Sequence, residues 1–450
     1  MTDHKKNTLP GKGAKGHLLL SEAEDRRKTV STQDAADAPA AEKSSDSPVS
    51  DEARFLEHIT RLAKDMAAFG VMSVRIDGYG AVPPPNKSVS NIAGIIGTIC
   101  KKAEGAWLKT GKDIFGCYLP DADEKKCRDA ANEMCRQISG ETSETVSIGI
   151  ALYPEISFEK KDIYGNAKKA LDHADFFGPG SIVRFDAVSL NISGDSFYQA
   201  GKIDAAMAEY ELALALDPEN VNVHNSIGVC HGDRKDLDKA LASFSRAVEL
   251  DPEDVFAIYN AGYIYMQKEE YQTALDYFQR AVKMDENVFE LLFQTGRALY
   301  ELGRADEALS YIYDAISKND APGPLVYRTI GDCSLATGNM DDAIKAYNTA
   351  LKLRPDDAHS LSALAFCYES ENSNPEIALV FGENAVEIDP KNGLFHHRLA
   401  LMYFSRNRLE EALIHFEAAV ECGHDESVPY RENTREMIDG NTKQENIAGS

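Results

Sequence analysis

The feature that most constrains the fold is a repeat, because small residues recur along the second half of the chain at a step of 34 residues. One series of glycines keeps this step; it consists of Gly194, Gly228, Gly262 and Gly296. Two series of alanines keep it as well; they are Ala206, Ala240, Ala274 and Ala308, and Ala213, Ala247, Ala281 and Ala315. A period of this length is typical of stacked helical hairpins. Residues 187–423 are therefore predicted to form an all-α solenoid.

Within each repeat the residue types follow one order. Counted from the start of a repeat, small residues occupy positions 8, 20 and 27, aromatic or aliphatic residues positions 11 and 24, and proline often position 32. Small residues let two antiparallel helices approach closely, and proline ends the second helix. The pattern resembles the tetratricopeptide repeat (TPR), and we count seven units, with an extra residue near Pro322 and another between Asn372 and Pro375. A capping helix over residues 424–440 and a frayed end over 441–450 are expected to follow.

The resemblance implies that a protein or peptide partner binds along the first helix of each unit. Positions 2, 5, 9 and 12 of this helix are not used by the packing pattern and share one side. Aromatic residues at these positions would anchor a peptide, and arginines would bind a carboxylate. The candidate partner-binding residues are Phe256, Tyr259, Tyr263, Phe293, Arg297, Tyr300 and Arg328. The alternative is that the aromatic residues pack between neighbouring repeats. The lysine and asparagine pattern of chaperone-binding repeats is absent, so chaperone tails are not expected as partners.

Residues 52–186 predict a small α/β domain. Helical spacing of apolar residues over 52–69, around 92–99 and over 161–174 predicts helices, and a further helix is expected to begin at Asp121. Strands are predicted over 71–76, 107–109, 114–119, 146–152 and 182–185. The order βαββαβ, with additional elements at both ends, predicts a ferredoxin-like arrangement.

Two stretches of this domain resemble GGDEF domains, the fold of diguanylate cyclases. Val146 to Ala151, followed by Tyr153-Pro154, is similar to the family's late strand, and Lys109 to Phe115 stands where the family has its signature turn. The resemblance implies a role in bacterial signalling. The complete chain is therefore predicted to be a multidomain protein, in which an α/β ferredoxin-like (GGDEF-like) domain precedes an all-α TPR solenoid.

The departures from the family predict that this domain has no catalytic or metal-binding residues. The resemblance places the metal-binding aspartate of the first strand at Arg75 and the catalytic acid of the signature turn at Ile114. It also places the second glycine of that turn at Lys112, and a phosphate-binding lysine at Asp175. Joining two GTP molecules requires carboxylates that hold divalent metal, so no enzymatic activity, cofactor or metal is expected. The alternative is a nucleotide-responsive regulator, in which the domain still binds GTP or cyclic diguanylate as a sensor.

Composition limits the partners and the compartment. The net charge of −25 disfavours nucleic acids and anionic membranes at long range. The eight cysteines form no Cys-x-x-Cys pair, which favours reduced thiols in the cytoplasm. Residues 1–50 are poor in aromatic residues and are expected to be a disordered tail, and they contain no apolar run of signal-peptide length. The sequence thus predicts a non-enzymatic cytoplasmic adaptor.

Overall fold

The computed structural model describes residues 51–81, 84–156, 158–319 and 321–448, with side chains as far as residue 439. The tail expected over residues 1–50 lies outside the described residues. The chain divides into two compact units, of which the first ends at Ile264 and the second begins at Tyr265. This division falls inside one helix of the repeats and not at residues 186 and 187, where the sequence suggested a domain boundary.

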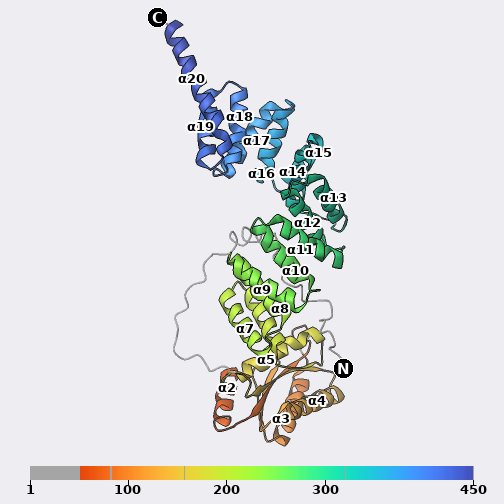
Figure 1. Cartoon of the computed structure of the whole chain (residues 1–450). Coiled ribbons are helices and arrows are strands. Elements are labelled where there is room, and N and C mark those ends of the chain that lie inside the picture. The colour runs from red at the N-terminus through yellow and green to blue at the C-terminus, as the bar shows by residue number, and fades with distance from the viewer. Residues whose placement is uncertain (1–50, 82–83, 157, 320, 449–450) are drawn as a thin grey trace. The chain divides into compact units, whose positions relative to one another are not determined.

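The first unit contains a small mixed sheet of five strands (Figure 1). The strands are β1 (Phe69–Ile76), β2 (Ala106–Lys109), β3 (Ile114–Pro120), β4 (Val146–Tyr153) and β5 (Ile182–Arg184). Their order across the sheet is β2-β3-β1-β4-β5, so the first strand of the sequence lies in the centre. β1 pairs antiparallel with β3 and β4, β2 pairs antiparallel with β3, and β5 pairs parallel with β4.

Helices cover both faces of this sheet, because successive side chains of its strands point to opposite faces and apolar side chains lie on both. Met72, Val74 and Ile76 of β1 face a core with α3 (Asn86–Lys102) and α4 (Glu124–Glu141). The opposite face carries α2 (Asp51–Leu62) and α5 (Ile163–Ala174). Two details differ from the sequence expectation. The first helix ends at Leu62 and not at residue 69, and the N-cap of α4 is Asp123, whose carboxylate accepts the Lys126 amide at 2.8 Å.

The first repeats share a core with the sheet domain. Helices α6 (Ala187–Gln199) and α7 (Ile203–Leu216) follow β5 directly, and α6 begins with a capping box at Asp186. Phe55, Tyr164 and Tyr210 belong to one continuous cluster of buried side chains, which joins α2, α5 and α7. Lys169 of α5 forms an ion pair of 2.7 Å with Glu209 of α7. This shared packing explains why the sheet and the first repeats form a single compact unit. The remaining helices of this unit are α8 (Val221–Asp233), α9 (Leu237–Leu250) and the first part of α10 (Val255–Gln267).

The second unit continues the helical pairs. They are α11 (Tyr271–Met284), α12 (Phe289–Glu301), α13 (Ala305–Ser317), α14 (Pro324–Ala336), α15 (Met340–Leu353), α16 (Ala358–Ser370), α17 (Pro375–Ile388), α18 (Gly393–Ser405) and α19 (Leu409–Glu421). From α11 onward each helix packs on the next, and the first helices α12, α14, α16 and α18 also contact one another in this order. The pairs therefore stack in sequence order.

Small residues allow these pairs to form, as the sequence predicts. A Cβ atom at Gly194 would lie 2.4 Å from the Tyr210 ring, and one at Gly331 would lie 2.5 Å from the Tyr347 ring. The alanines of both 34-residue series are fully buried. The helices thus approach so closely that the ring at position 24 fills the space left by glycine at position 8.

The irregular places of the repeat lie in loops, except at the C-terminus. The inserted residue of the sixth unit lies in the turn between α16 and α17, where Asn372 adopts a positive φ of 49°. The capping helix α20 runs from Val428 to Ala448, so it does not end at residue 440. The expectation of a frayed end from residue 441 is corrected for 441–448, because the sequence there contains neither glycine nor proline to stop the helix.

Candidate functional site

The three candidates in α10 differ in their access to solvent. Phe256 is 39% exposed, whereas Tyr259 is 1% exposed and lies in the packed interior. Tyr263 is partly buried, and its ring stacks on the Tyr259 ring with centroids 6.3 Å apart. Tyr259 thus packs behind Tyr263, and of the three candidates on this helix only Phe256 and Tyr263 are at least partly exposed to solvent.

The candidates in α12 divide in the same way. Phe293 is 3% exposed and stacks on Phe289, with ring centroids 5.7 Å apart. Arg297 and Tyr300 are partly exposed, and Arg297 Nη1 donates to Gln294 Oε1 at 3.1 Å. Burial, followed by the charge of Asp332, raises the pKa of Tyr300 to about 12, so its hydroxyl stays protonated at neutral pH.

The last candidate, Arg328 of α14, is neutralised within the chain. Its Nη1 lies 3.1 Å from Oδ1 of Asp357, a buried carboxylate that also caps α16 by accepting the Ser360 amide. A guanidinium held in this way stabilises the junction of two repeats and has less charge to offer a partner.

A polar cluster that the sequence did not single out lies on the first helices of units four to seven. We call it the first-helix cluster; its members are Tyr300, Asp332, His359, Ser362, Phe366 and Arg398. Asp332 lies at its centre, and its Oδ1 accepts from the Tyr347 hydroxyl and from His359 Nε2, both at 2.7 Å. Asp332 stands at position 9 of its unit, whereas Arg398 stands at position 6, which the expected binding positions leave out.

Arg398 of α18 is the cation of this cluster. It is partly buried, and its guanidinium lies over the Phe366 ring at 5.2 Å and donates to Ser362 Oγ at 3.4 Å. Among the described side chains it has no ion pair with a carboxylate, since Asp332 is held by Tyr347 and His359. Burial lowers the pKa of Arg398, while Tyr347, Asp332 and Tyr300 act in the opposite direction. The side chain nevertheless stays charged at neutral pH, as arginine does in proteins.

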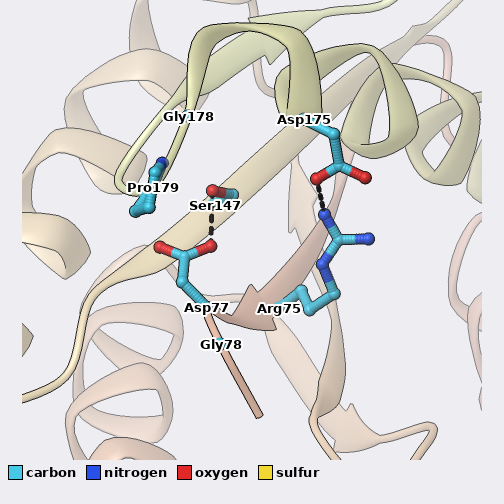
Figure 2. A pocket seen from close by; sticks show the side chains of 7 residues that line it. All are labelled: Arg75, Asp77, Gly78, Ser147, Asp175, Gly178 and Pro179. Atoms are coloured by element: carbon cyan, nitrogen blue, oxygen red, sulfur yellow. Dashed lines mark hydrogen bonds and ion pairs between the residues drawn. The ribbon is translucent and has the colours of Figure 1, made fainter. Parts of the chain in front are cut away.

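The sheet domain has a separate cavity at the end of β1, with a volume of about 290 Å³. Figure 2 shows the Arg75 guanidinium directed at the Asp175 carboxylate, with which it forms an ion pair and a hydrogen bond. Asp172 of α5 lies 3.9 Å from the same guanidinium. Burial raises the pKa of Asp172, and Arg75 opposes this shift.

Asp77, on the other side of this cavity, is occupied by hydrogen bonds. Its Oδ1 accepts from Ser147 Oγ at 2.6 Å (Figure 2). Its Oδ2 accepts from Thr145 Oγ1 at 2.7 Å and from the Gly180 amide at 2.8 Å. Lys112 is exposed in the turn between β2 and β3, and Ile114 pairs with Arg75 across the strands. In the described part of the chain no group of three or more His, Cys, Asp or Glu side chains is placed to hold a metal ion.

Comparison with known families identifies the repeats. The family described as "TPR repeat" matches residues 194–233, and families described as "Tetratricopeptide repeat" match residues 221–254, 259–324, 324–357 and 397–423. The helical solenoid is therefore built from tetratricopeptide repeats, as the spacing of small residues predicts. No curated protein sequence matches the chain.

Several solved structures of repeat proteins are similar to parts of the chain. The crystal structure of YrrB, "a TPR protein with an unusual peptide-binding site", is 26% identical, covers 42% of this chain and 96% of its own, and has a TM-score of 0.36. A MamA structure is 27% identical, with 37% and 96% coverage and a TM-score of 0.33. A tetratricopeptide repeat protein from Parabacteroides merdae is 16% identical, with 56% and 97% coverage and a TM-score of 0.43.

Two further observations concern the environment of the chain. The eight cysteines are all free thiols, and burial raises the pKa of several of them, including Cys127 to about 12. None of the helices within the described residues is long and apolar enough to cross a membrane.

Proposed function

We propose that this protein is a non-enzymatic adaptor that binds a protein or peptide segment on the first helices of its TPR units. Stacked repeats offer extended surfaces to partners. The observation that carries the proposal is the adjacency of α12, α14, α16 and α18, which leaves aromatic and cationic side chains partly exposed along one row of helices. Phe256, Tyr263, Arg297 and Tyr300 are the proposed contact residues. Tyr259, Phe293 and Arg328 of the original set would support them from within the packing.

A capture experiment with the full chain tests this proposal. We compare the wild type with the double variant Arg297→Glu/Tyr300→Ala, because both side chains are partly exposed on α12. The matched control is Tyr313→Ala, which removes an aromatic ring that is 52% exposed on the second helix α13. We expect a partner recovered by the wild type and the control to be reduced at least tenfold with the double variant. Equal recovery by all three would place the binding surface elsewhere.

For the sheet domain we infer a degenerate GGDEF-like fold without cyclase activity. The central position of β1 between β3 and β4 supports a ferredoxin-like arrangement. At the position that resembles the family's metal site, Arg75 is paired with Asp175, and Ile114 has no atom that could bind metal or move a proton. Losing one electrostatic element typically costs about 10²–10³ in rate, so losing several should abolish turnover. Cyclic diguanylate formed from GTP and Mg²⁺ by the purified chain would contradict this inference.

A nucleotide-responsive regulator is the second candidate. It is favoured by the cavity beside Arg75 and Asp77, whose volume of about 290 Å³ is at the lower end of ligand pockets, roughly 300–1,000 Å³. Calorimetry with GTP and with cyclic diguanylate separates the two candidates. A heat of binding that disappears in Arg75→Met would support the sensor, whereas no heat and no thermal shift would eliminate it.

The compartment and pathway are part of the same proposal. Eight free cysteines suit a reducing compartment such as the cytoplasm. The resemblance to GGDEF domains further suggests a place in bacterial signalling. Nucleic acids and membranes are not proposed as partners, because the net charge of −25 repels phosphates at long range.

A further inference from the structure

We propose that Arg398 is the specificity anchor of the TPR surface, and that it binds the side-chain carboxylate of an internal Asp or Glu in an extended peptide. This inference rests on the proposed adaptor function and names the chemistry of its partner. It concerns the first-helix cluster of the second unit, defined above.

The first argument is the incomplete pairing of Arg398. A partly buried guanidinium loses hydration, and this cost is normally offset by a carboxylate at hydrogen-bonding distance. Two other arginines at repeat junctions of this unit have such a partner: Arg328 has Asp357 at 3.1 Å, and Arg406 has Glu369 at 2.8 Å. Arg398 has only a weak neutral contact with Ser362 and the face of Phe366 among the described side chains. An incoming carboxylate would supply the missing partner.

The second argument is that Asp332, the acid that raises the pKa of Arg398, makes its hydrogen bonds with other donors. Its Oδ1 receives hydrogen bonds from both Tyr347 and His359, and it forms no ion pair with Arg398. Tyr347 is fully buried, so this arrangement is fixed by the packing of the fifth unit. Arg398 therefore has no carboxylate at hydrogen-bonding distance among the described side chains, and its planar fork is suited to bidentate contact with one.

The third argument identifies an internal acidic residue as the occupant. Arg398 stands on the seventh unit, and its guanidinium contacts Ser362 and Phe366 of the sixth. A peptide that follows the first helices past Arg398 thus has chain on both sides of the anchor. Asp332 beside the anchor would accept a donor from the same peptide, which favours a segment of mixed charge.

Peptide binding tests the proposal directly. The probes are matched sets of randomised 15-residue peptides with blocked ends, which carry either Glu or Gln at the central position, and a third set with central Gln and a free C-terminal carboxylate. The full chain is compared with Arg398→Met, Arg398→Lys and Arg304→Met, the last a matched control at the exposed N-cap position of α13. Binding is measured by fluorescence polarisation, and folding by the melting temperature.

We expect the wild type and Arg304→Met to bind the Glu peptides at least tenfold more tightly than the Gln peptides. This difference should disappear in Arg398→Met and be partly kept in Arg398→Lys, which has the charge without the fork. We also expect Arg398→Met to melt no lower than the wild type, because it removes a buried charge that has no partner. A residue needed only for folding would show the opposite change in melting temperature.

Other outcomes overturn the proposal in distinguishable ways. If Gln peptides bind as tightly as Glu peptides, or if the preference survives in Arg398→Met, the anchor is wrong while peptide binding stands. A preference for the free C-terminal carboxylate over the central Glu would also overturn the internal occupant. If no peptide set binds the wild type, the proposed adaptor function fails together with the anchor.

Discussion

The sheet domain and the TPR units differ in whether a partly buried arginine is paired with a carboxylate. In the cavity of the sheet domain, Arg75 is paired with Asp175, and Asp77 is saturated by hydroxyl and amide donors. In the first-helix cluster, Arg398 has no carboxylate partner among the described side chains, and Asp332 of the same cluster is held by other donors. Within one chain, therefore, one charged site is closed by internal contacts and another is left open.

The difference lies in how the two regions are built. An arginine in the repeat array can stay without a carboxylate partner, whereas the arginine in the packed sheet domain is paired. Around Arg75, strand β1 and helix α5 belong to a packed sheet with helices on both faces, so Asp172 of α5 and Asp175 directly after it reach the cation. Around Arg398, each first helix belongs to a separate repeat, and hydrogen bonds join side chains of the fifth, sixth and seventh units. No carboxylate of the described residues forms an ion pair with Arg398, which is why we propose that a partner supplies one.

The largest effect on stability is expected for Gly149→Ala, because the added methyl group would clash with the backbone of α5. A Cβ atom at Gly149 would lie 2.1 Å from the Ala167 carbonyl oxygen and 2.3 Å from the Leu171 amide, so Gly149→Ala forces β4 away from α5. We expect a loss of more than about 3 kcal/mol in the free energy of unfolding. Urea unfolding followed by Trp107, the single tryptophan, reports on the first unit.

The control for this change is Gly165→Ala in α5, the helix that packs against Gly149; an added Cβ there meets nothing within 4 Å. It is expected to stabilise the helix by about 0.5–1 kcal/mol. Equal effects of the two substitutions would show that the β4–α5 contact does not limit the first unit.

A smaller loss is expected from the equivalent substitution in the repeats. Gly331→Ala places a Cβ atom 2.5 Å from the Tyr347 ring, which can tilt more easily than a backbone can move. We expect a loss of about 1–3 kcal/mol, visible as faster hydrogen exchange in α14 and α15. Gly323→Ala, with no atom within 4 Å, should change exchange little. If Gly331→Ala lowered the free energy of unfolding as much as Gly149→Ala, the Tyr347 ring would be as unable to move as the backbone of α5.

The third test removes the ion pair between Arg75 and Asp175 in the sheet domain. Arg75→Asp would bring a third carboxylate to Asp172 and Asp175, and repulsion among them should destabilise the first unit by about 1–3 kcal/mol. Millimolar Ca²⁺ should restore part of the loss, since clustered carboxylates bind hard cations. The melting temperatures of the wild type and of Arg75→Met should not respond to Ca²⁺. A Ca²⁺-dependent wild type would mean that the site is not closed by Arg75.

The smallest effect is a pH dependence at the end of the repeats. Burial, with a contribution from His424, lowers the pKa of His397 to about 4. An unfolded histidine titrates near 6.5, so as pH falls from about 6.5 to about 4 protonation increasingly favours the unfolded chain. His397→Phe should flatten this part of the stability profile of the second unit, measured by exchange in α18. An unchanged slope would show that the ring is not buried as a neutral group.

Much of the architecture could be read from the sequence because its causes are local. Gly331 and Tyr347 stand 16 positions apart, so the spacing alone brings them together once two helices form a hairpin. The same holds for the strands and helices of residues 52–186, which differ from expectation mainly at their ends. The N-cap at Asp123 was missed because Asp121 has the same side chain two residues earlier and only the backbone, with φ of 45° there, decides between them.

The candidate binding surface was less predictable, because the type of a residue does not reveal whether its side chain is buried or forms an ion pair with a neighbouring repeat. Tyr259 and Phe293 suit a binding surface by type, yet they lie buried beneath Tyr263 and beside Phe289. Arg328 has the right position for an anchor, but Asp357 of the next unit neutralises it. Such pairs join different repeats, and the spacing within one repeat contains no information about them.

The sequence by itself determined that this chain forms helical hairpins, because helix contacts within a repeat depend on a few small residues at fixed spacing. That Arg75 and Ile114 stand where GGDEF domains have acids is a prediction from resemblance and stays part of our proposal. Only the tertiary structure decided which cation is left without a partner, since that depends on side chains from several units meeting at Asp332. It also decided that the sheet and the first repeats share one core, because burial of Tyr210 beside Tyr164 and Phe55 arises only when these segments are packed together.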